Sequence, residues 1–178
     1  MKYVKLFVKT FLRTLLKPLS FVPAICMMLI IYGFSGQDGA DSSRLSYQVS
    51  HAIVKVADKV LDKDLSEAQI DAYAEKYHHL IRKMAHFTEY LLLGASVALP
   101  LYVYGLRGFA LVFFTGAFCV GFACLDEFHQ SFVAGRGPSK KDVVIDSLGS
   151  FTGIYCTRIF GFVGRKTVFA PLAKKKDK

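Results

Sequence analysis

Side chains that could do chemistry lie at the ends of the apolar runs in the second half of the chain. In chain order they are Arg82, Lys83, His86, Glu89, Asp126, Glu127, His129, Gln130, Arg136, Lys140, Lys141, Asp142 and Asp146. The arginines and lysines can donate hydrogen bonds to a phosphate, and carboxylates can hold them in place. The imidazoles and carboxylates can also transfer protons or bind metal ions.

The spacing of these residues predicts that they share helical faces. Arg82, His86 and Glu89 follow one another at steps of four and three, which places all three on one face of a helix. The same four-residue step joins two further pairs, Asp126 with Gln130 and Asp142 with Asp146. Each group can therefore point in a single direction from its helix.

The composition indicates that the elements holding these residues are membrane helices. Hydrophobic residues make up 53% of the 178 residues and charged residues only 21%, whereas soluble domains have about 45–50% and about 25%. The apolar excess is gathered into runs, which excludes a disordered chain and disfavours a water-soluble domain. A net charge of +9 suits nucleic acid or anionic lipid. The runs favour the lipid bilayer, and no nucleic-acid partner is expected.

The runs predict an all-α membrane protein with a bundle of four transmembrane helices. The expected spans are residues 18–34, 84–104, 109–125 and 143–164, with Pro100 kinking the second. Residues 1–17 are expected to form a basic amphipathic helix, and residues 165–178 a basic tail. Between the first two spans, residues 35–80 are expected to form a helical cap outside the membrane. That cap would hold helices at 42–61 and 66–77, the second starting at an S-x-x-Q capping signal.

The charge distribution predicts the orientation. Lysine and arginine are concentrated in the first arm without nearby acidic residues, while residues 35–83 are long and mixed in charge. The positive-inside rule then places both termini in the cytoplasm. With this orientation, the polar residues named above would all lie at the outer face of the membrane.

The depth of the polar residues predicts a shared pocket. A helical rise of 1.5 Å per residue puts Glu89 roughly 10 Å below Arg82. A charge near the centre of a span costs about 2.5–3.5 kcal/mol, so such groups must face the bundle interior or a wet cavity. We therefore expect an outward-facing polar pocket, walled by the second, third and fourth spans.

Three interpretations of this pocket stay open. It could be a structural network in which Arg82 or Arg136 neutralises Glu89 and Asp146. It could bind an anionic head group through Arg82, Lys83, Arg136 and Lys140. It could be a catalytic or metal site: His86, Glu89, Asp126 and Glu127 are the catalytic candidates, and His86, Glu89, Asp126 and His129 the weak metal candidates. No H-E-x-x-H or G-x-S-x-G motif is present, and the sequence defines no cofactor.

Other reactive residue types are expected to have no special role. The four cysteines all fall inside apolar runs, without a C-x-x-C pair, so we expect them to pack within the spans. His51, His78 and His79 lie in the acidic outer segment, where a histidine is usually solvated.

Three segments carry a family resemblance. RKMAHFTEYLLLGA at residues 82–95 resembles the K-x-x-H-F-x-x-Y-x-x-L-G signature of VanZ-like membrane proteins. DEFHQSFVAGRGPSKKDVVIDSLGSFTG at residues 126–153 is similar to that family's D-E-x-x-Q-x-F-x-x-G-R block, and FSGQDGADSS at residues 34–43 resembles the polar stretch after its first span. Ala134 and Asp146 depart from the pattern, with Asp146 standing where many members have Asn. The role of that Asn is therefore not carried over.

The resemblance implies about four spanning helices in a bacterial cell envelope and a link to the glycopeptide teicoplanin. It adds Tyr90 to the binding candidates, which are Arg82, Lys83, His86, Glu89, Tyr90, Asp126, Glu127, Gln130, Arg136, Asp142 and Asp146. The expected role is engagement of a lipid-linked, phosphate-bearing cell-wall precursor or of the drug that targets it. The alternatives are a membrane hydrolase acting on a lipid phosphate and a structural helper of another membrane protein. The sequence does not define the oligomeric state.

Overall fold

The computed structural model describes residues 18–166, with side chains described up to residue 161. The described part consists of helices and connecting turns, which confirms the all-α prediction. The helices are α2 (Val22–Ser35), α3 (Gly39–Leu61), α4 (Glu67–Val103), α5 (Gly108–Gln130) and α6 (Lys140–Lys166). The expected amphipathic helix at 1–17, and all but the start of the tail, lie outside the described residues.

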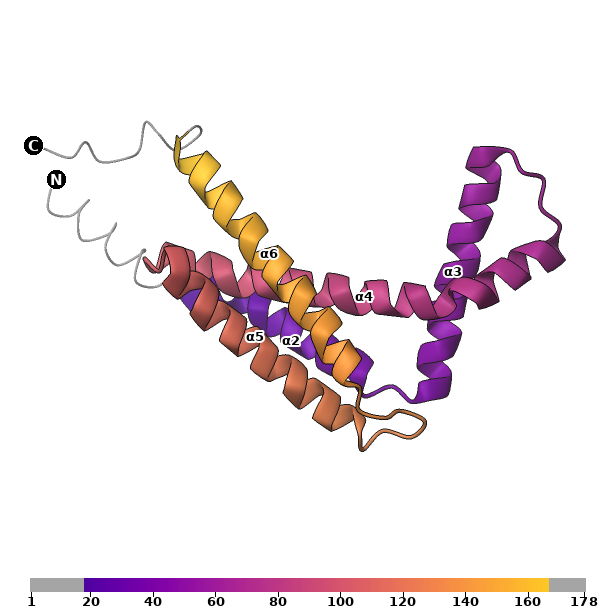
Figure 1. The fold of residues 1–178 in the computed structure, drawn as a ribbon, viewed down its shortest axis with the longest axis horizontal. Helices are drawn as coiled ribbons and strands as arrows, with labels where there is room; N and C mark the ends of the chain where they lie inside the picture. The colour runs from indigo at the N-terminus through magenta and orange to yellow at the C-terminus, as the bar shows by residue number, and fades with distance from the viewer. Residues whose placement is uncertain (1–17, 167–178) are drawn as a thin grey trace, which may run out of the picture.

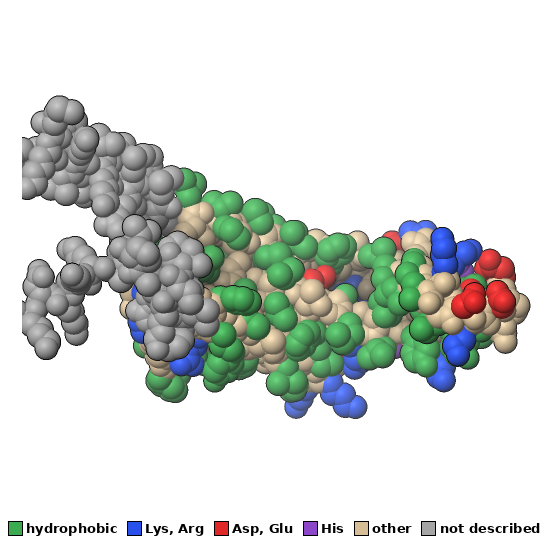
Figure 2. Space-filling model, turned by 90° about the horizontal axis from the view of Figure 1, so that it is seen from above, with side chains coloured by type: hydrophobic (Ala, Val, Ile, Leu, Met, Phe, Trp, Pro, Cys, Tyr) green, Lys and Arg blue, Asp and Glu red, His purple; other side chains and the backbone are tan. Residues whose placement is uncertain are grey.

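Two of the described helices, α4 and α5, are long and apolar enough to cross a membrane. α2 is apolar but has only 14 residues, and α6 does not meet the same test of length and composition over its described part. The space-filling view shows hydrophobic side chains over the middle of the molecule, while acidic side chains gather at one end (Figure 2). The four-span arrangement stays a prediction.

α4 is the longest of the described helices. It replaces the two separate helices that the sequence predicted. The helix expected at 66–77 and the second span form one continuous helix of 37 residues. No Gly or Pro occurs between residues 67 and 93, so nothing in that stretch interrupts the helix. The expected capping signal is confirmed, because the Ser66 side chain accepts a hydrogen bond from the Gln69 backbone N–H, and the Gln69 side-chain oxygen accepts one from the Ser66 backbone N–H.

Helix α3 forms a hairpin with the first part of α4 and projects from one end of the molecule (Figure 1). Tyr47 donates to the Asp71 carboxylate at 2.9 Å, and this bond raises the pKa of the tyrosine above its ordinary value. Lys55 pairs with Glu67 at 3.1 Å near the turn. Two serines, Ser46 and Ser50, are buried on α3.

The apolar stripe of α3 is exposed. Its side chains are Leu45, Val49, Ile53, Val56 and Val60, each at least 41% exposed. These side chains share one face of α3, and the first two, Leu45 and Val49, also border a cavity against α4.

Helices α4 and α6 cross in close backbone contact, which glycines make possible. A Cβ atom on Gly153 would lie 2.0 Å from the Leu91 carbonyl oxygen, and one on Gly149 would lie 2.3 Å from the Phe87 carbonyl oxygen. On the facing helix, a Cβ on Gly94 would lie 2.3 Å from the Ser150 carbonyl oxygen. The pair Gly149 and Gly153 has the G-x-x-x-G spacing that lets membrane helices approach closely.

The apolar core lies among α2, α4 and α5. Tyr90 and Leu93 on α4 pack with Ile31 on α2 and with Cys119 and Ala123 on α5. The ring of Tyr90 is fully buried, with its centroid 6.3 Å from that of Phe122. These contacts fix the rotation of α4 and therefore the direction in which its polar face points.

Candidate functional site

Two neighbouring cavities open at the end of the bundle where α3 and α4 meet the α5–α6 loop. The first has a volume of about 170 Å³ and is walled by the end of α2, by α3, by α4 and by Arg136. The second, of about 220 Å³, is walled by α4, by the end of α5, by the loop around Arg136 and by α6. Arg82, His86 and Arg136 line both cavities, so the two share a wall of three basic side chains.

The second cavity is lined by residues of α4, of the end of α5, of the α5–α6 loop and of α6. Several of the expected binding residues line one or both cavities: Arg82, Lys83, His86, Glu89, Gln130, Arg136 and Asp142. Arg136 and Glu89 in particular line the same cavity although they are 47 positions apart in the sequence. The polar end therefore gathers charges from three separate segments in one place.

The two arginines have few partners. Arg82 donates to the Ser43 hydroxyl at 2.5 Å, and Arg136 donates to the Phe34 carbonyl at 3.2 Å. Among the described residues neither guanidinium forms an ion pair with a carboxylate, and the Nε atom of each is buried without an acceptor. Burial lowers the pKa of Arg136 from its ordinary value, and the positive charge of Arg82 lowers it further.

The imidazole of His86 stands between two carboxylates. Its Nδ1 lies 3.9 Å from an oxygen of Asp146 and 4.0 Å from an oxygen of Glu89. The His86 side chain is 18% exposed, whereas Asp146 is fully buried behind it. Both Asp146 carboxylate oxygens lack a hydrogen-bond donor among the described residues. Asp146 therefore supports the cavity from behind and does not line it.

Three more of the expected residues are buried around the site. Asp126 accepts a hydrogen bond from the Gln130 amide at 3.2 Å, one turn along α5. Glu127 accepts from the backbone N–H of Ser139 at 2.7 Å, which fastens the end of the loop just before α6. Tyr90 lies in the core. Asp126, Glu127 and Tyr90 are not among the side chains that line either cavity.

The α5–α6 loop, residues 131–139, is held against the turn between α2 and α3. The backbone N–H of Gly39 donates to the Ala134 carbonyl at 2.9 Å. A Cβ atom on Gly39 would lie 2.2 Å from the Gly135 carbonyl oxygen, and Gly135 itself has φ +71°. Only glycine fits at position 39, because a Cβ there would clash with the loop backbone. At position 135 the positive φ favours glycine. This seam brings Arg136 over the face of α4 that carries Arg82.

The weak metal candidates do not come together as a ligand set. The described residues contain no group of three His, Cys, Asp or Glu side chains placed to hold a metal ion. His129 instead stacks on Tyr32 of α2, with the ring centroids 4.7 Å apart. One of the expected phosphate donors, Lys140, is exposed and lines neither cavity, and the same is true of its neighbour Lys141.

Sequence reasoning missed the contribution of α3 and of two histidines. Ser42 and Ser46 line the first cavity and Ser43 holds Arg82, although the serine-rich stretch had been noted only for its resemblance. His79, expected to be solvated, lines the second cavity. His78 is 8% exposed, so the expectation of a solvated side chain there was wrong. Its Nδ1 lies 2.6 Å from the carbonyl oxygen of Glu75, one turn earlier on α4.

Comparison with known proteins gives a family but no individual relative. No curated protein and no solved structure is found to match the chain. The family model described as VanZ/LLP1 matches residues 20–161. That range includes both cavities, the glycine contact of α4 with α6, and all three segments that carry the resemblance. The chain is therefore a member of the VanZ/LLP1 family.

Proposed function

We propose that this family member is a multi-pass protein of the bacterial cell envelope that binds the phosphate of an anionic, lipid-linked head group. The phosphate would sit between Arg82 and Arg136, with His86 beside it. Four spans, α2, α4, α5 and α6, would cross the membrane, with both termini in the cytoplasm and the cavities facing outward.

One observation carries this proposal. Two guanidinium groups line the same cavities, neither is ion-paired with a carboxylate among the described residues, and each keeps a buried Nε without an acceptor. A buried charged donor without a partner is unfavourable, and like charges brought together add to the cost. An anion bound between the two would satisfy both donors and relieve the repulsion, and the planar guanidinium fits phosphate oxygens well.

The surrounding carboxylates support this role by position. Glu89 lines the first cavity and Asp142 the second, and Asp142 lies 3.6 Å from the amine of Lys83 at the rim. These acids keep the site from carrying a large excess of positive charge when it is empty. Arg82 and Arg136 are the two arginines that line both cavities.

The test is binding of a polyprenyl phosphate to the purified full-length protein in detergent. Arg136→Ala should weaken binding by about tenfold or more, because it removes a charge-assisted contact with the phosphate. Arg44→Gln is the matched control, since Arg44 is an exposed arginine paired with Asp41 outside both cavities. Equal binding by wild type and Arg136→Ala, with both proteins folded, would refute the proposal.

The same preparation separates the alternatives. Release of inorganic phosphate from the polyprenyl phosphate would support a membrane hydrolase, with His86 as the first residue to replace. Co-purification of one stoichiometric membrane partner would support a structural helper.

The link to teicoplanin is tested in cells. Arg136→Ala and Glu89→Gln should both change susceptibility to this drug if the cavities engage the precursor or the drug itself. Variants that reach the membrane at normal levels and leave susceptibility unchanged would remove the link to the drug.

A further inference from the structure

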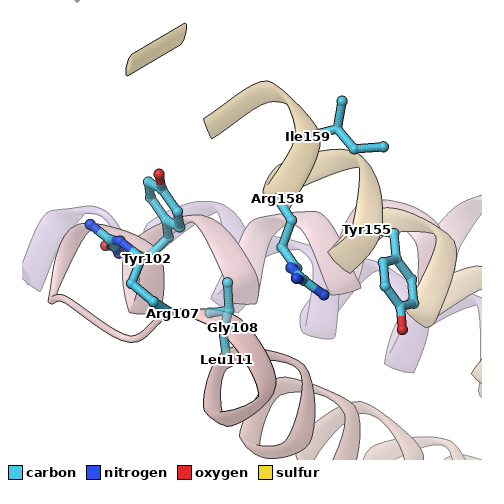
Figure 3. Close-up of a pocket in the computed structure, with 7 residues that line it drawn as sticks. All are labelled: Tyr102, Arg107, Gly108, Leu111, Tyr155, Arg158 and Ile159. Atoms are coloured by element: carbon cyan, nitrogen blue, oxygen red, sulfur yellow. Dashed lines mark hydrogen bonds between the residues drawn. The ribbon is translucent and has the colours of Figure 1, made fainter. Parts of the chain in front are cut away.

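A third cavity lies at the opposite end of the bundle from the candidate site. It has a volume of about 480 Å³ and lies between the α4–α5 turn and α6 (Figure 3). Its wall contains Arg107 and Arg158, Tyr102 and Tyr155, and the apolar residues Leu111 and Ile159. From Arg82 to Tyr102, α4 rises roughly 30 Å, which is the thickness of the hydrocarbon core of a bilayer.

None of the described residues that line this cavity is acidic. The chain has no Asp or Glu between Glu89 and Asp126, and none between Asp146 and Asp177. The guanidinium of Arg158 lies 5.5 Å from the ring centroid of Tyr155 and forms no ion pair among the described residues. Figure 3 shows it extending from α6 into the space toward the start of α5. Arg158 is thus free to meet an anion.

Arg107 is fixed at the other side of the cavity. Its guanidinium lies 3.6 Å from the ring centroid of Tyr102 and donates to the carbonyls of Tyr102 and Leu106. This side chain therefore satisfies carbonyls at the end of α4 and places a positive charge on the wall. The first turn of α5, which follows at once, has no side-chain cap, so its free N–H groups add to the positive potential.

We infer that this cavity binds the phosphate diester of an anionic phospholipid head group. The two arginines supply charge, the two tyrosines suit the membrane interface, and Leu111 and Ile159 offer an apolar wall to the first acyl carbons. A free phosphate shares the charge but has no use for that apolar wall. The inference is independent of the proposed function, because the two sites share no residue.

The experiment compares lipid binding by the full-length protein in neutral detergent, read by native mass spectrometry. Phosphatidylglycerol and phosphatidylcholine are the probes, and inorganic phosphate is added as a competitor. Wild type should bind phosphatidylglycerol in preference to phosphatidylcholine. Arg158→Gln should lower binding of phosphatidylglycerol by about tenfold and leave phosphatidylcholine unchanged. Arg158→Lys should retain part of the preference, and Arg44→Gln all of it.

Arg158 makes no side-chain hydrogen bond with the described residues, so its replacement should leave the fold intact; a thermal melt checks this. Three results would overturn the inference: equal binding of the two lipids by wild type, an unchanged preference in Arg158→Gln, or displacement of phosphatidylglycerol by millimolar inorganic phosphate. The third would assign the cavity to a free anion. None of these results bears on polyprenyl phosphate binding at Arg136, so failure here is distinguishable from failure there.

Discussion

The two ends of the bundle place arginines in opposite surroundings. At the polar end, Arg82 and Arg136 are partly buried, lie among carboxylates, and are positioned by three segments far apart in the sequence. At the other end, Arg107 and Arg158 lie against tyrosine rings with no acid nearby in the sequence. The first arrangement requires three segments far apart in the sequence to come together, whereas the second involves Arg107 at the start of α5 and Arg158 within α6.

This difference indicates how each end should respond to mutation. The polar end depends on backbone seams that bring the loop, α3 and α4 together, so a small change in packing should remove its binding. The basic end depends on charge at a surface, so its binding should decline in steps as charges are removed. Three changes, with a control, test or sharpen this contrast.

The largest effect is expected from Gly153→Ala, because α4 and α6 carry residues of both ends. The added Cβ would lie 2.0 Å from the Leu91 carbonyl oxygen, which forces the helices apart. We expect a loss of roughly 3 kcal/mol or more in the free energy of unfolding, with loss of binding at both ends. Thermal unfolding in detergent measures it.

Gly121→Ala is the control, since a Cβ there meets no atom within 4 Å. It should change stability by no more than about 1 kcal/mol, in the stabilising direction. Equal stability of the two variants would show that the close contact of α4 with α6 does not hold the bundle together.

A smaller and one-sided effect is expected from Gly39→Ala. The Cβ would lie 2.2 Å from the Gly135 carbonyl oxygen, so the loop bearing Arg136 should shift away from α3. We expect a cost of about 1–2 kcal/mol and loss of polyprenyl phosphate binding, while phosphatidylglycerol binding persists. Gly121→Ala, which meets no atom within 4 Å and lies outside both cavities, should keep binding at both ends. Parallel loss of both activities in Gly39→Ala would contradict the separation of the two ends.

The smallest effect is expected from Lys83→Gln. Its amine lies 3.6 Å from Asp142, and the two side chains are 48% and 35% exposed. Solvent screens such a pair, so stability should change by no more than about 0.5 kcal/mol. A chemical denaturation curve measures this change in the free energy of unfolding. A loss of several kcal/mol would mean that the rim pair is part of the buried network.

The sequence predicts the parts of this fold that follow from the cost of burying polar groups. Glu89 and Asp146 fall within or beside apolar runs, so a shared enclosure could be predicted, and Arg136 does line the cavity that Glu89 lines. The capping signal at Ser66 also has a local cause and was read correctly.

The remaining features depend on close contacts between backbone segments, and such contacts produce no repeating pattern in the sequence. The contact of Gly39 with Gly135 joins residues far apart in the chain, so the part of α3 in the site could not be derived from spacing. The stripe from Leu45 to Val60 has a clear helical period, but a period does not say what covers the face. The continuity of α4 was missed because a change from polar to apolar composition was taken for a helix boundary.

The most direct test of the central claim, that Arg82 and Arg136 hold one anion together, is a double-mutant cycle on polyprenyl phosphate binding. Arg82→Gln and Arg136→Gln should each weaken binding by about tenfold. The double variant should lose clearly less than the hundredfold product, because removing either arginine already relieves the repulsion that the anion would otherwise relieve. Losses that multiply fully, or single variants that bind like wild type, would contradict a phosphate shared by the two arginines.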